Sequence, residues 1–407
     1  MIRLFRLPAV RLLAKVALLA LAVVLVVSVV TGSARAQSYS VLHTFQGASQ
    51  GGDGSTPYAG LVRGPGGNLY GTTYFGGGYG KGVVFKIGSG GVYSLPHTFR
   101  GGSDGAHAWA GLIRDAAGNL YGTTALGGGN GCGSNGCGVV FKVTIKNKET
   151  VLHAFIGGAT DGQAPLARLV RDSSGNLYGT TYAGGTSNLG TVFRVDSTLG
   201  ESVSYSFPGD PNGWGPYAGL VRDPVGNLYG TTAGGGAGFG TVFRLDTSGT
   251  ETVLYPFAGG TDGSLPEADL IRDAQGNLYG TTVGGGAFGF GTIFKVDTVG
   301  NETVLHSFGG QDGEHPYAGL IQDAGGNFYG TASGGGTFGF GTVFKLAASG
   351  QLAVLYSFSG GADGANPQSP VVRDAAGNIY GTTFAGGSTG RSCKRIGGCG
   401  VVFKIAP

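Results

Sequence analysis

The sequence predicts an all-β protein built from one unit repeated in tandem, and three observations lead to that prediction. Glycine accounts for 87 of the 407 residues, a density that excludes a helical bundle because each glycine in a helix interior costs about 1 kcal/mol. The glycines do not recur at every third position, which excludes collagen. Hydrophobic residues make up 41% of the chain and the phrase GN(L/F/I)YGT returns seven times, so disorder is excluded as well.

The repeated phrase sets the period of the unit. Its asparagine occurs at Asn68, Asn119, Asn176, Asn227, Asn277, Asn327 and Asn378. Successive copies are 50, 51 or 57 residues apart. Fixed periods of about 40 to 50 residues are typical of propellers and solenoids.

Each unit contains four short segments with the composition of strands. In the fourth copy these segments are 219–222, 227–232, 241–245 and 251–257. They are rich in β-branched and aromatic residues and are bounded by glycine, aspartate and proline, which is the pattern of strands joined by turns. Four strands in each repeat are characteristic of a propeller blade.

The two ends of the chain favour a closed ring over an open solenoid. Residues 38–45 have the pattern of a fourth strand without the three before it, and residues 400–405 that of a third strand without the fourth after it. Pairing them removes the free edges of the sheet. We therefore predict a seven-bladed β-propeller of four-stranded blades, closed by the N-terminal strand. The predicted blades are 58–99, 109–155, 165–207, 216–257, 266–308, 316–358, and 367–407 together with 38–45.

Residues 1–36 are predicted to be a signal peptide. A basic start precedes an apolar run over 16–30, and Ala34-Arg35-Ala36 matches a cleavage site. Cleavage after Ala36 leaves 37–407 as a single domain that is secreted or resides in the cell envelope. The alternative is an uncleaved membrane anchor, although the run is short for a membrane span.

Removal of this segment changes the charge balance. It takes away five of the 26 basic residues and none of the 23 acidic ones. No basic patch remains, so we expect no nucleic-acid partner. We expect a monomer.

The repeat resembles a known family. The phrase GL(V/I)RDxxGN(L/F)YGTTxxGGGxxGxGTVFK, which covers 58–407, is similar to the GloVer tandem-repeat family of secreted bacterial proteins, and more distantly to NHL-type propeller blades through its Asp-x-x-Gly-Asn turn. Members of that family carry different C-terminal surface anchors. This chain shows none, so free secretion is expected, and the resemblance implies no catalytic residues.

Several repeated polar residues are interpreted as structural. The Asp-x-x-Gly-Asn corners are expected to be turns capped by the aspartate. His43, His97, His153 and His306 share a repeat position with Tyr205, Tyr255 and Tyr356, and tyrosine does not replace histidine as a metal ligand or a base. The Asp-Gly pairs before each blade are expected to form turns, with calcium binding as the less favoured alternative. No metal or cofactor is therefore predicted.

The four cysteines are expected to form two local disulfides. An even number of cysteines in an exported chain favours disulfides, and an intervening blade separates the loops that hold them. We predict the pairs Cys132–Cys137 and Cys393–Cys399. A zinc site that uses all four thiolates would require the two loops to meet.

Candidate functional residues lie where the repeats differ. The residue after the recurring proline, at the expected channel mouth, is Tyr58, Trp109, Leu166, Tyr217, Glu267, Tyr317 or Gln368. Two positions later most blades have glycine, whereas three have Arg168, Asp269 or Pro370. Trp214, His107 and His315 are close in sequence and are expected on the same face.

These residues support two functional hypotheses. The first is a non-catalytic interaction or binding module, in which aromatic rings and a few polar groups bind carbohydrate or a cell-envelope protein. The second is a hydrolase or lyase, with Glu267 and Asp269 as a carboxylate pair and His107 or His315 as a base. A third, structural interpretation is that the aromatic side chains simply plug the channel.

Overall fold

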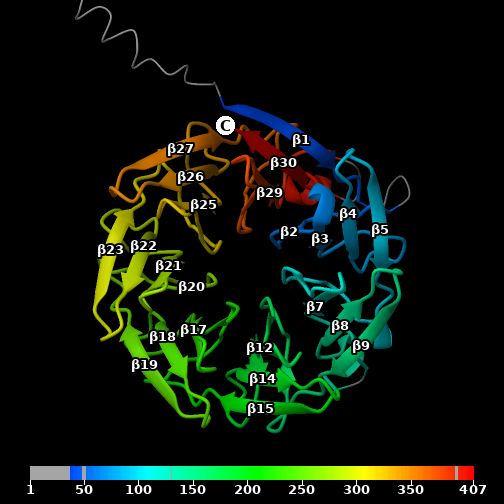
Figure 1. Cartoon of the computed structure of the whole chain (residues 1–407), viewed down its shortest axis with the longest axis vertical. Helices are drawn as coiled ribbons and strands as arrows, with labels where there is room; N and C mark the ends of the chain where they lie inside the picture. Colours follow the sequence, from blue (N-terminus) through cyan, green and yellow to red (C-terminus); the bar gives the residue numbers. More distant parts are fainter. Residues whose placement is uncertain (1–36, 48–51, 130, 390–392) are drawn as a thin grey trace, which may run out of the picture. The chain divides into compact units, whose positions relative to one another are not determined.

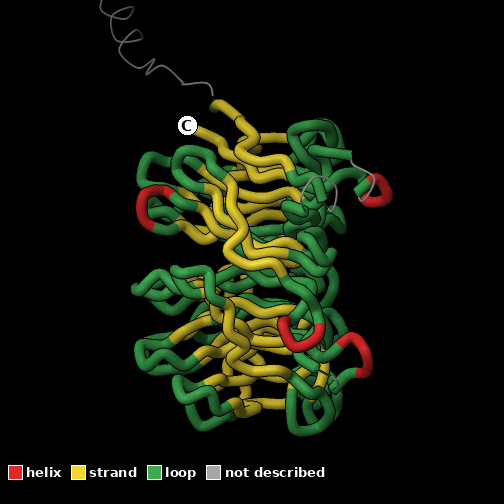
Figure 2. The backbone as a smooth tube through the Cα atoms, turned by 90° about the vertical axis from the view of Figure 1, so that its right-hand side faces the viewer, coloured by secondary structure: helices red, strands yellow, loops and turns green. Residues whose placement is uncertain are grey.

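The computed structural model describes residues 37–47, 52–129, 131–389 and 393–407, and Tyr39–Ala406 form one compact unit. The signal peptide predicted for 1–36 lies outside the described residues. In the compact unit, seven four-stranded antiparallel sheets are arranged in a ring (Figure 1). The predicted seven-bladed β-propeller is confirmed. Figure 2 shows the strands between loops on both sides.

The strands of each blade follow one another in the chain. Blades 1 to 3 contain β2 (Val62–Arg63), β3 (Leu69–Thr73), β4 (Val83–Ile87) and β5 (Tyr93–Thr98); β6 (Ile113–Arg114), β7 (Leu120–Thr124), β8 (Val139–Val143) and β9 (Glu149–Ala154); and β11 (Val170–Arg171), β12 (Leu177–Thr181), β14 (Thr191–Val195) and β15 (Glu201–Ser206). Blades 4 to 6 contain β16 (Val221–Arg222), β17 (Leu228–Thr232), β18 (Thr241–Leu245) and β19 (Glu251–Pro256); β20 (Ile271–Arg272), β21 (Leu278–Thr282), β22 (Thr292–Val296) and β23 (Glu302–Ser307); and β24 (Ile321–Gln322), β25 (Phe328–Ala332), β26 (Thr342–Leu346) and β27 (Leu352–Ser357). Blade 7 contains β28 (Val372–Arg373), β29 (Ile379–Thr383), β30 (Val401–Ala406) and β1 (Ser38–Thr44).

Short elements complete the described structure. They are the two-stranded ribbon of β10 (Gly162–Gln163) and β13 (Ala183–Gly184), and the 3-10 turns η1 (Pro65–Gly67), η2 (Gly102–Asp104), η3 (Gly133–Asn135) and η4 (Lys394–Ile396). Among the described residues no helix is both long and apolar enough to cross a bilayer. The innermost strand of each blade is shorter than predicted, with only two residues in β16.

The N-terminal strand closes the ring as predicted. The strand order in blade 7 is β1-β30-β29-β28, and Figure 1 shows the blue β1 beside the red β30. The backbone N–H of Phe45 donates to the carbonyl of Gly400 at 3.1 Å, and the Phe45 ring is fully buried. The N-terminal segment thus supplies the edge strand of blade 7, and Phe45, which follows that strand, packs in the core between blades 7 and 1.

The hydrophobic core lies between neighbouring blades. One cluster joins Val242 and Phe257 of blade 4 to Leu278 and Phe294 of blade 5. The glycine of YGT leaves room for the phenylalanine of the next strand in the same blade, because a Cβ at Gly280 would lie 2.7 Å from the ring of Phe294. The repeated glycine is therefore a consequence of the close approach of a phenylalanine ring to the strand.

The Asp-x-x-Gly-Asn corners have the predicted capped geometry. At Asp223, Oδ1 accepts hydrogen bonds from the backbone of Gly226 and Asn227, and Oδ2 accepts from the Asn227 amide and the Tyr229 hydroxyl. Burial opposes ionisation, but these hydrogen bonds outweigh it and hold the pKa of Asp223 below its ordinary value. The corners therefore use their carboxylates for structure.

Both predicted disulfides are present. Cys132 is bonded to Cys137 in blade 2, and Cys393 to Cys399 in blade 7. Each pair lies in the loop between the second and third strands of its blade. No free cysteine remains in the described part of the chain, so the four-thiolate zinc alternative is wrong.

Candidate functional site

A backbone conformation with positive φ recurs at one position of each blade, just before the segment that leads to the channel mouth. In every blade the residue two positions before the variable mouth position has a positive φ, at Thr56, His107, Ala164, Gly215, Leu265, His315 and Asn366. Six of the seven variable positions line the cavity, whereas Gln368 of blade 7 does not. Six of the seven residues with positive φ are not glycine, so the conformation is costly. Hydrogen bonds hold it in place: in blade 5, Leu265 donates to the carbonyl of Phe239 in blade 4 and accepts from the N–H of Val283.

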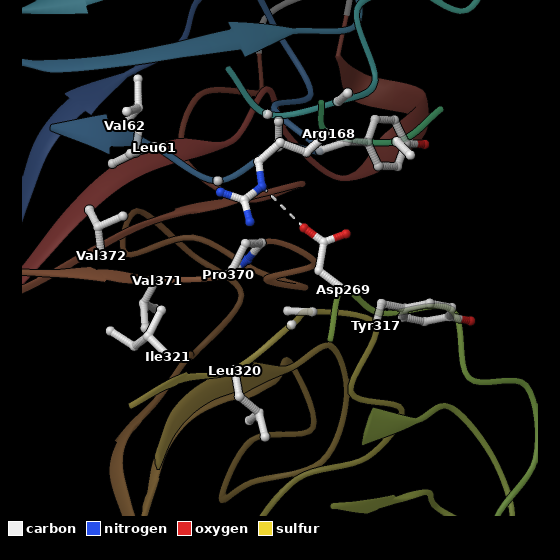
Figure 3. Close-up of a pocket in the computed structure, with 18 of the residues that line it drawn as sticks. Leu61, Val62, Arg168, Asp269, Tyr317, Leu320, Ile321, Pro370, Val371 and Val372 are labelled. Carbon is white, nitrogen blue, oxygen red and sulfur yellow. Dashed lines mark hydrogen bonds and ion pairs between the residues drawn. The ribbon is translucent and has the colours of Figure 1, made fainter. Parts of the chain in front are cut away.

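The segments that follow these seven residues enclose one cavity. Its volume is about 470 Å³, and every blade contributes to its wall. Figure 3 shows apolar residues from blades 1, 6 and 7, including Leu61, Leu320 and Val371, together with a polar group formed by Arg168 and Asp269. A largely apolar wall with a few converging polar groups is typical of ligand sites.

The polar group links three blades. The Nε atom of Arg168 in blade 3 lies 3.3 Å from Oδ2 of Asp269 in blade 5. Oδ1 of Asp269 accepts a hydrogen bond from the backbone of Gly219 in blade 4 at 2.6 Å. A Cβ at Gly219 would lie only 2.8 Å from the Arg168 carbonyl oxygen. Gly219 of blade 4 therefore leaves the space in which the side chains of Arg168 and Asp269 meet.

An aromatic cluster forms one side of the mouth. The rings of Tyr58 and Trp109 are stacked, with centroids 3.9 Å apart and an interplanar angle of 13°. Tyr74 meets both rings edge-on at 5.5 Å, and Phe384 lies 4.8 Å from Tyr58. Burial raises the pKa of Tyr58 and Tyr74, so their hydroxyls stay neutral and able to donate.

A carboxyl group between two tyrosines forms the other side. Glu267 of blade 5 lines the cavity together with Tyr217 and Tyr317 of the adjacent blades. Burial raises the pKa of Glu267 to about 7. Burial also raises the pKa of Tyr317, and the charge of Glu267 adds to the shift. No hydrogen bond joins Glu267 to another described side chain, so its carboxyl group is available to a ligand.

The structure assembles some of the predicted site residues and separates others. The cavity is lined by Tyr58, Trp109, Arg168, Tyr217, Glu267, Asp269 and Tyr317. His107, His315 and Trp214 are not in its wall. The Nδ1 atoms of the two histidines lie 2.9 and 3.0 Å from the carbonyl oxygens of Tyr74 and Val283, and the Trp214 side chain lies over Gly234.

The placement of these residues tests whether Glu267 and Asp269 form a catalytic carboxylate pair with a histidine base. Glu267 and Asp269 face the same cavity, although neither lies in a strand, since β20 begins at Ile271. The Asp269 carboxylate is already occupied by Arg168 and Gly219, and neither predicted histidine base joins the pair. The two carboxylates and a base are not brought together.

Sequence reasoning missed two residues of the aromatic side, Tyr74 and Phe384. Both directly follow the YGTT phrase, at a position where the other blades have Ala125, Tyr182, Ala233, Val283 or Ser333. Variation at this position was the signal that could have identified them.

Comparisons with known proteins agree with this architecture. The family model described as the Gloeobacter/Verrucomicrobia repeat matches residues 28–211, 131–287 and 200–393. A comparison with curated proteins finds no match.

Solved structures with similar folds are distant in sequence. A streptogramin B lyase structure is 12% identical with a TM-score of 0.57, covering 91% of this chain and 97% of that one. A structure described as the extracellular domain of a one-component system from B. thetaiotaomicron is 10% identical with a TM-score of 0.56, covering 90% of this chain and 40% of that one. At these identities the likeness concerns the fold alone.

Proposed function

The chain belongs to the Gloeobacter/Verrucomicrobia repeat family, and we propose that it is an exported propeller that binds a carbohydrate at the channel mouth without transforming it. The observation that carries this proposal is the stacked pair of Tyr58 and Trp109 in the wall of the cavity. Aromatic rings offer flat apolar faces with polar edges, which suit the apolar faces and hydroxyl groups of sugar rings.

Polar groups complete the proposed subsite. The Arg168 side chain is 50% exposed, so its remaining N–H groups can donate to sugar hydroxyls. Glu267 can accept or donate, because its pKa is raised to about 7 by burial. The cavity volume of about 470 Å³ lies in the range of about 300 to 1,000 Å³ that holds small ligands.

Two disulfides support the exported location. Such bonds form and persist in oxidising compartments and are rare in the cytosol. Together with the predicted signal peptide, they favour a secreted or cell-envelope protein whose ligand is a glycan of the envelope or the surroundings. A cell-envelope protein is the alternative partner.

A secreted hydrolase or lyase is the less supported alternative. Its favourable feature is Glu267, since a carboxyl with a pKa of about 7 suits a general acid. The second carboxylate, Asp269, is held by Arg168, and no histidine lines the cavity as described.

The two tryptophans of the chain allow a direct test. Protein 37–407 with Trp214→Phe keeps Trp109 as its only tryptophan, and protein with Trp109→Phe keeps Trp214. Titration with neutral and acidic oligosaccharides should give a saturable fluorescence change in the first variant and none in the second. Calorimetry should show weaker binding for Trp109→Phe and unchanged binding for Trp214→Phe. Equal binding by both variants, or no binding by wild type across the panel, would overturn the proposal.

A further inference from the structure

The outer rim of the ring contains seven junctions between successive blades. At each one, the end of an outermost strand and the loop that follows it meet the start of the outermost strand of the next blade. Three positions come together: the ring residue of the VLHTF phrase, the loop aspartate, and the first residue of the next outer strand. At two junctions these are His97, Asp104 and Glu149, and His153, Asp161 and Glu201.

We infer that these two clusters are binding sites for a divalent transition metal, with Zn²⁺ as the best-fitting ion. In each cluster one imidazole nitrogen and two carboxylate oxygens lie within 4.8 Å of one another. The Nε2 atom of His97 is 3.1 Å from an oxygen of Asp104, and that of His153 is 3.4 Å from an oxygen of Asp161. Ligands of a tetrahedral zinc ion are about 3.3 Å apart at bond lengths of about 2.0 Å.

The local electrostatics favour a cation. In each cluster a glutamate, Glu149 or Glu201, lies beside an aspartate, so two negatively charged groups face each other. The Oε1 atoms of both glutamates are buried without a hydrogen-bond partner in the described structure. A divalent cation would relieve the repulsion between the two carboxylates.

The ligand set discriminates between metals. Calcium needs six to eight oxygen ligands, which three side chains including an imidazole do not provide. Zinc binds histidine nitrogen and carboxylate oxygen, and three protein ligands leave a fourth position for water.

The other junctions lack at least one ligand. Tyrosine replaces the histidine at Tyr205, Tyr255 and Tyr356, and Asn212 takes the place of the aspartate beside Glu251. The pair of His306 and Asp312 is followed by Leu352 in place of a glutamate. At the remaining junction, Tyr93 stacks on His43 with centroids 4.0 Å apart.

Variation among the repeats at the histidine position predicts no metal. Replacement of histidine by tyrosine does argue against a site repeated around the whole ring. It does not argue against a site at the two junctions where all three ligands coincide. Because each ligand set spans two blades, a bound ion would join blade 1 to blade 2, and blade 2 to blade 3.

The inference is tested by zinc stoichiometry on chelator-treated protein 37–407. Calorimetry or equilibrium dialysis should give two equivalents of zinc for wild type. His97→Tyr and His153→Tyr should each leave one equivalent, and the double variant none. These substitutions install the residue that three other blades carry at the same position, so the fold should be kept. His306→Tyr is the matched control and should leave two equivalents.

The contribution of the glutamates to zinc binding is tested by two reciprocal substitutions. Glu149→Leu installs the residue of the blade 6 position and should weaken one site at least about tenfold. Leu352→Glu should add a third equivalent beside His306 and Asp312. Zinc should raise the melting temperature of wild type and leave that of the double histidine variant unchanged, because only ions bound to the folded state stabilise it. No saturable binding by wild type, or two equivalents retained by the double variant, would overturn the inference.

Discussion

The channel mouth and the outer rim are built from the same repeat, but differences between copies have opposite consequences in the two regions. At the mouth, residues from every blade line a single cavity. Residues as far apart as Arg168 and Asp269 therefore interact directly. At the rim, each junction joins only two neighbouring blades, and the set of His97, Asp104 and Glu149 is complete on its own. Residues that differ between repeats therefore act together in one cavity when they lie near the axis of the ring. At the periphery, such residues affect only the junction between two blades.

The largest expected effect tests whether both regions depend on closure of the ring. Deleting residues 37–45 removes β1 and the buried Phe45 ring from blade 7. Loss of a buried phenylalanine side chain alone costs about 3 to 5 kcal/mol. We expect the melting temperature to fall by at least about 10 °C. A synthetic peptide of residues 37–47 should restore it, and an unchanged melt of the truncated protein would contradict the closure.

A smaller effect separates the two partners of the pair at the mouth. Asp269→Ala removes the acceptor of the Gly219 N–H as well as the partner of Arg168. We expect it to destabilise the protein by about 1 to 3 kcal/mol, since a backbone donor loses its acceptor. Arg168→Ala removes a half-exposed side chain and should cost less than about 1 kcal/mol. Chemical denaturation measures both, and equal losses would show that the hydrogen bond to Gly219 contributes nothing.

The smallest expected effect is a dependence of stability on pH that both regions share. Burial raises the pKa of Glu267 at the mouth and of Glu302 at the rim to about 7. The folded state therefore binds more protons than the unfolded chain between about pH 4.5 and 7, so stability should fall as the pH rises through this range and then level off. Glu267→Gln and Glu302→Gln should each flatten part of that fall.

The controls for this prediction come from the corners. The pKa of Asp223 is lowered, so its contribution should be lost only as the pH falls below about 3.8. Melting temperatures measured between pH 3 and 8 in the presence of a chelator would show both the loss of stability below about pH 3.8 and the fall between about pH 4.5 and 7. A profile in which stability rises from pH 4.5 to 7 would contradict the assignment of the glutamates.

Much of the fold could be predicted from the sequence because its determinants are local. The YGT glycine, the Asp-x-x-Gly-Asn corner and the short spacing of Cys132 and Cys137 act within one blade. Even the ring closure follows from which strand is missing at each end. The same locality explains why most of the mouth residues were found: they follow directly after the recurring proline.

What the sequence did not show depends on contacts between blades. Arg168 and Asp269 are separated by 101 residues and meet across blade 4. The rim clusters combine residues such as His97 and Glu149, which occupy different positions in different repeats, so an alignment of the repeats does not bring them together. The non-glycine residues with positive φ were also missed, because hydrogen bonds from the preceding blade stabilise that conformation.

The most direct test of the central claim is the affinity of a variant whose mouth is made more regular. Trp109→Leu and Tyr58→Leu together install the residue that blade 3 has at this position, Leu166. The proposed function predicts that calorimetry shows at least about tenfold weaker binding of the oligosaccharide, with the melting temperature nearly unchanged, because it assigns the binding face to the stacked aromatic pair. Unchanged affinity in the double variant would contradict the claim that departures from the repeat create the site.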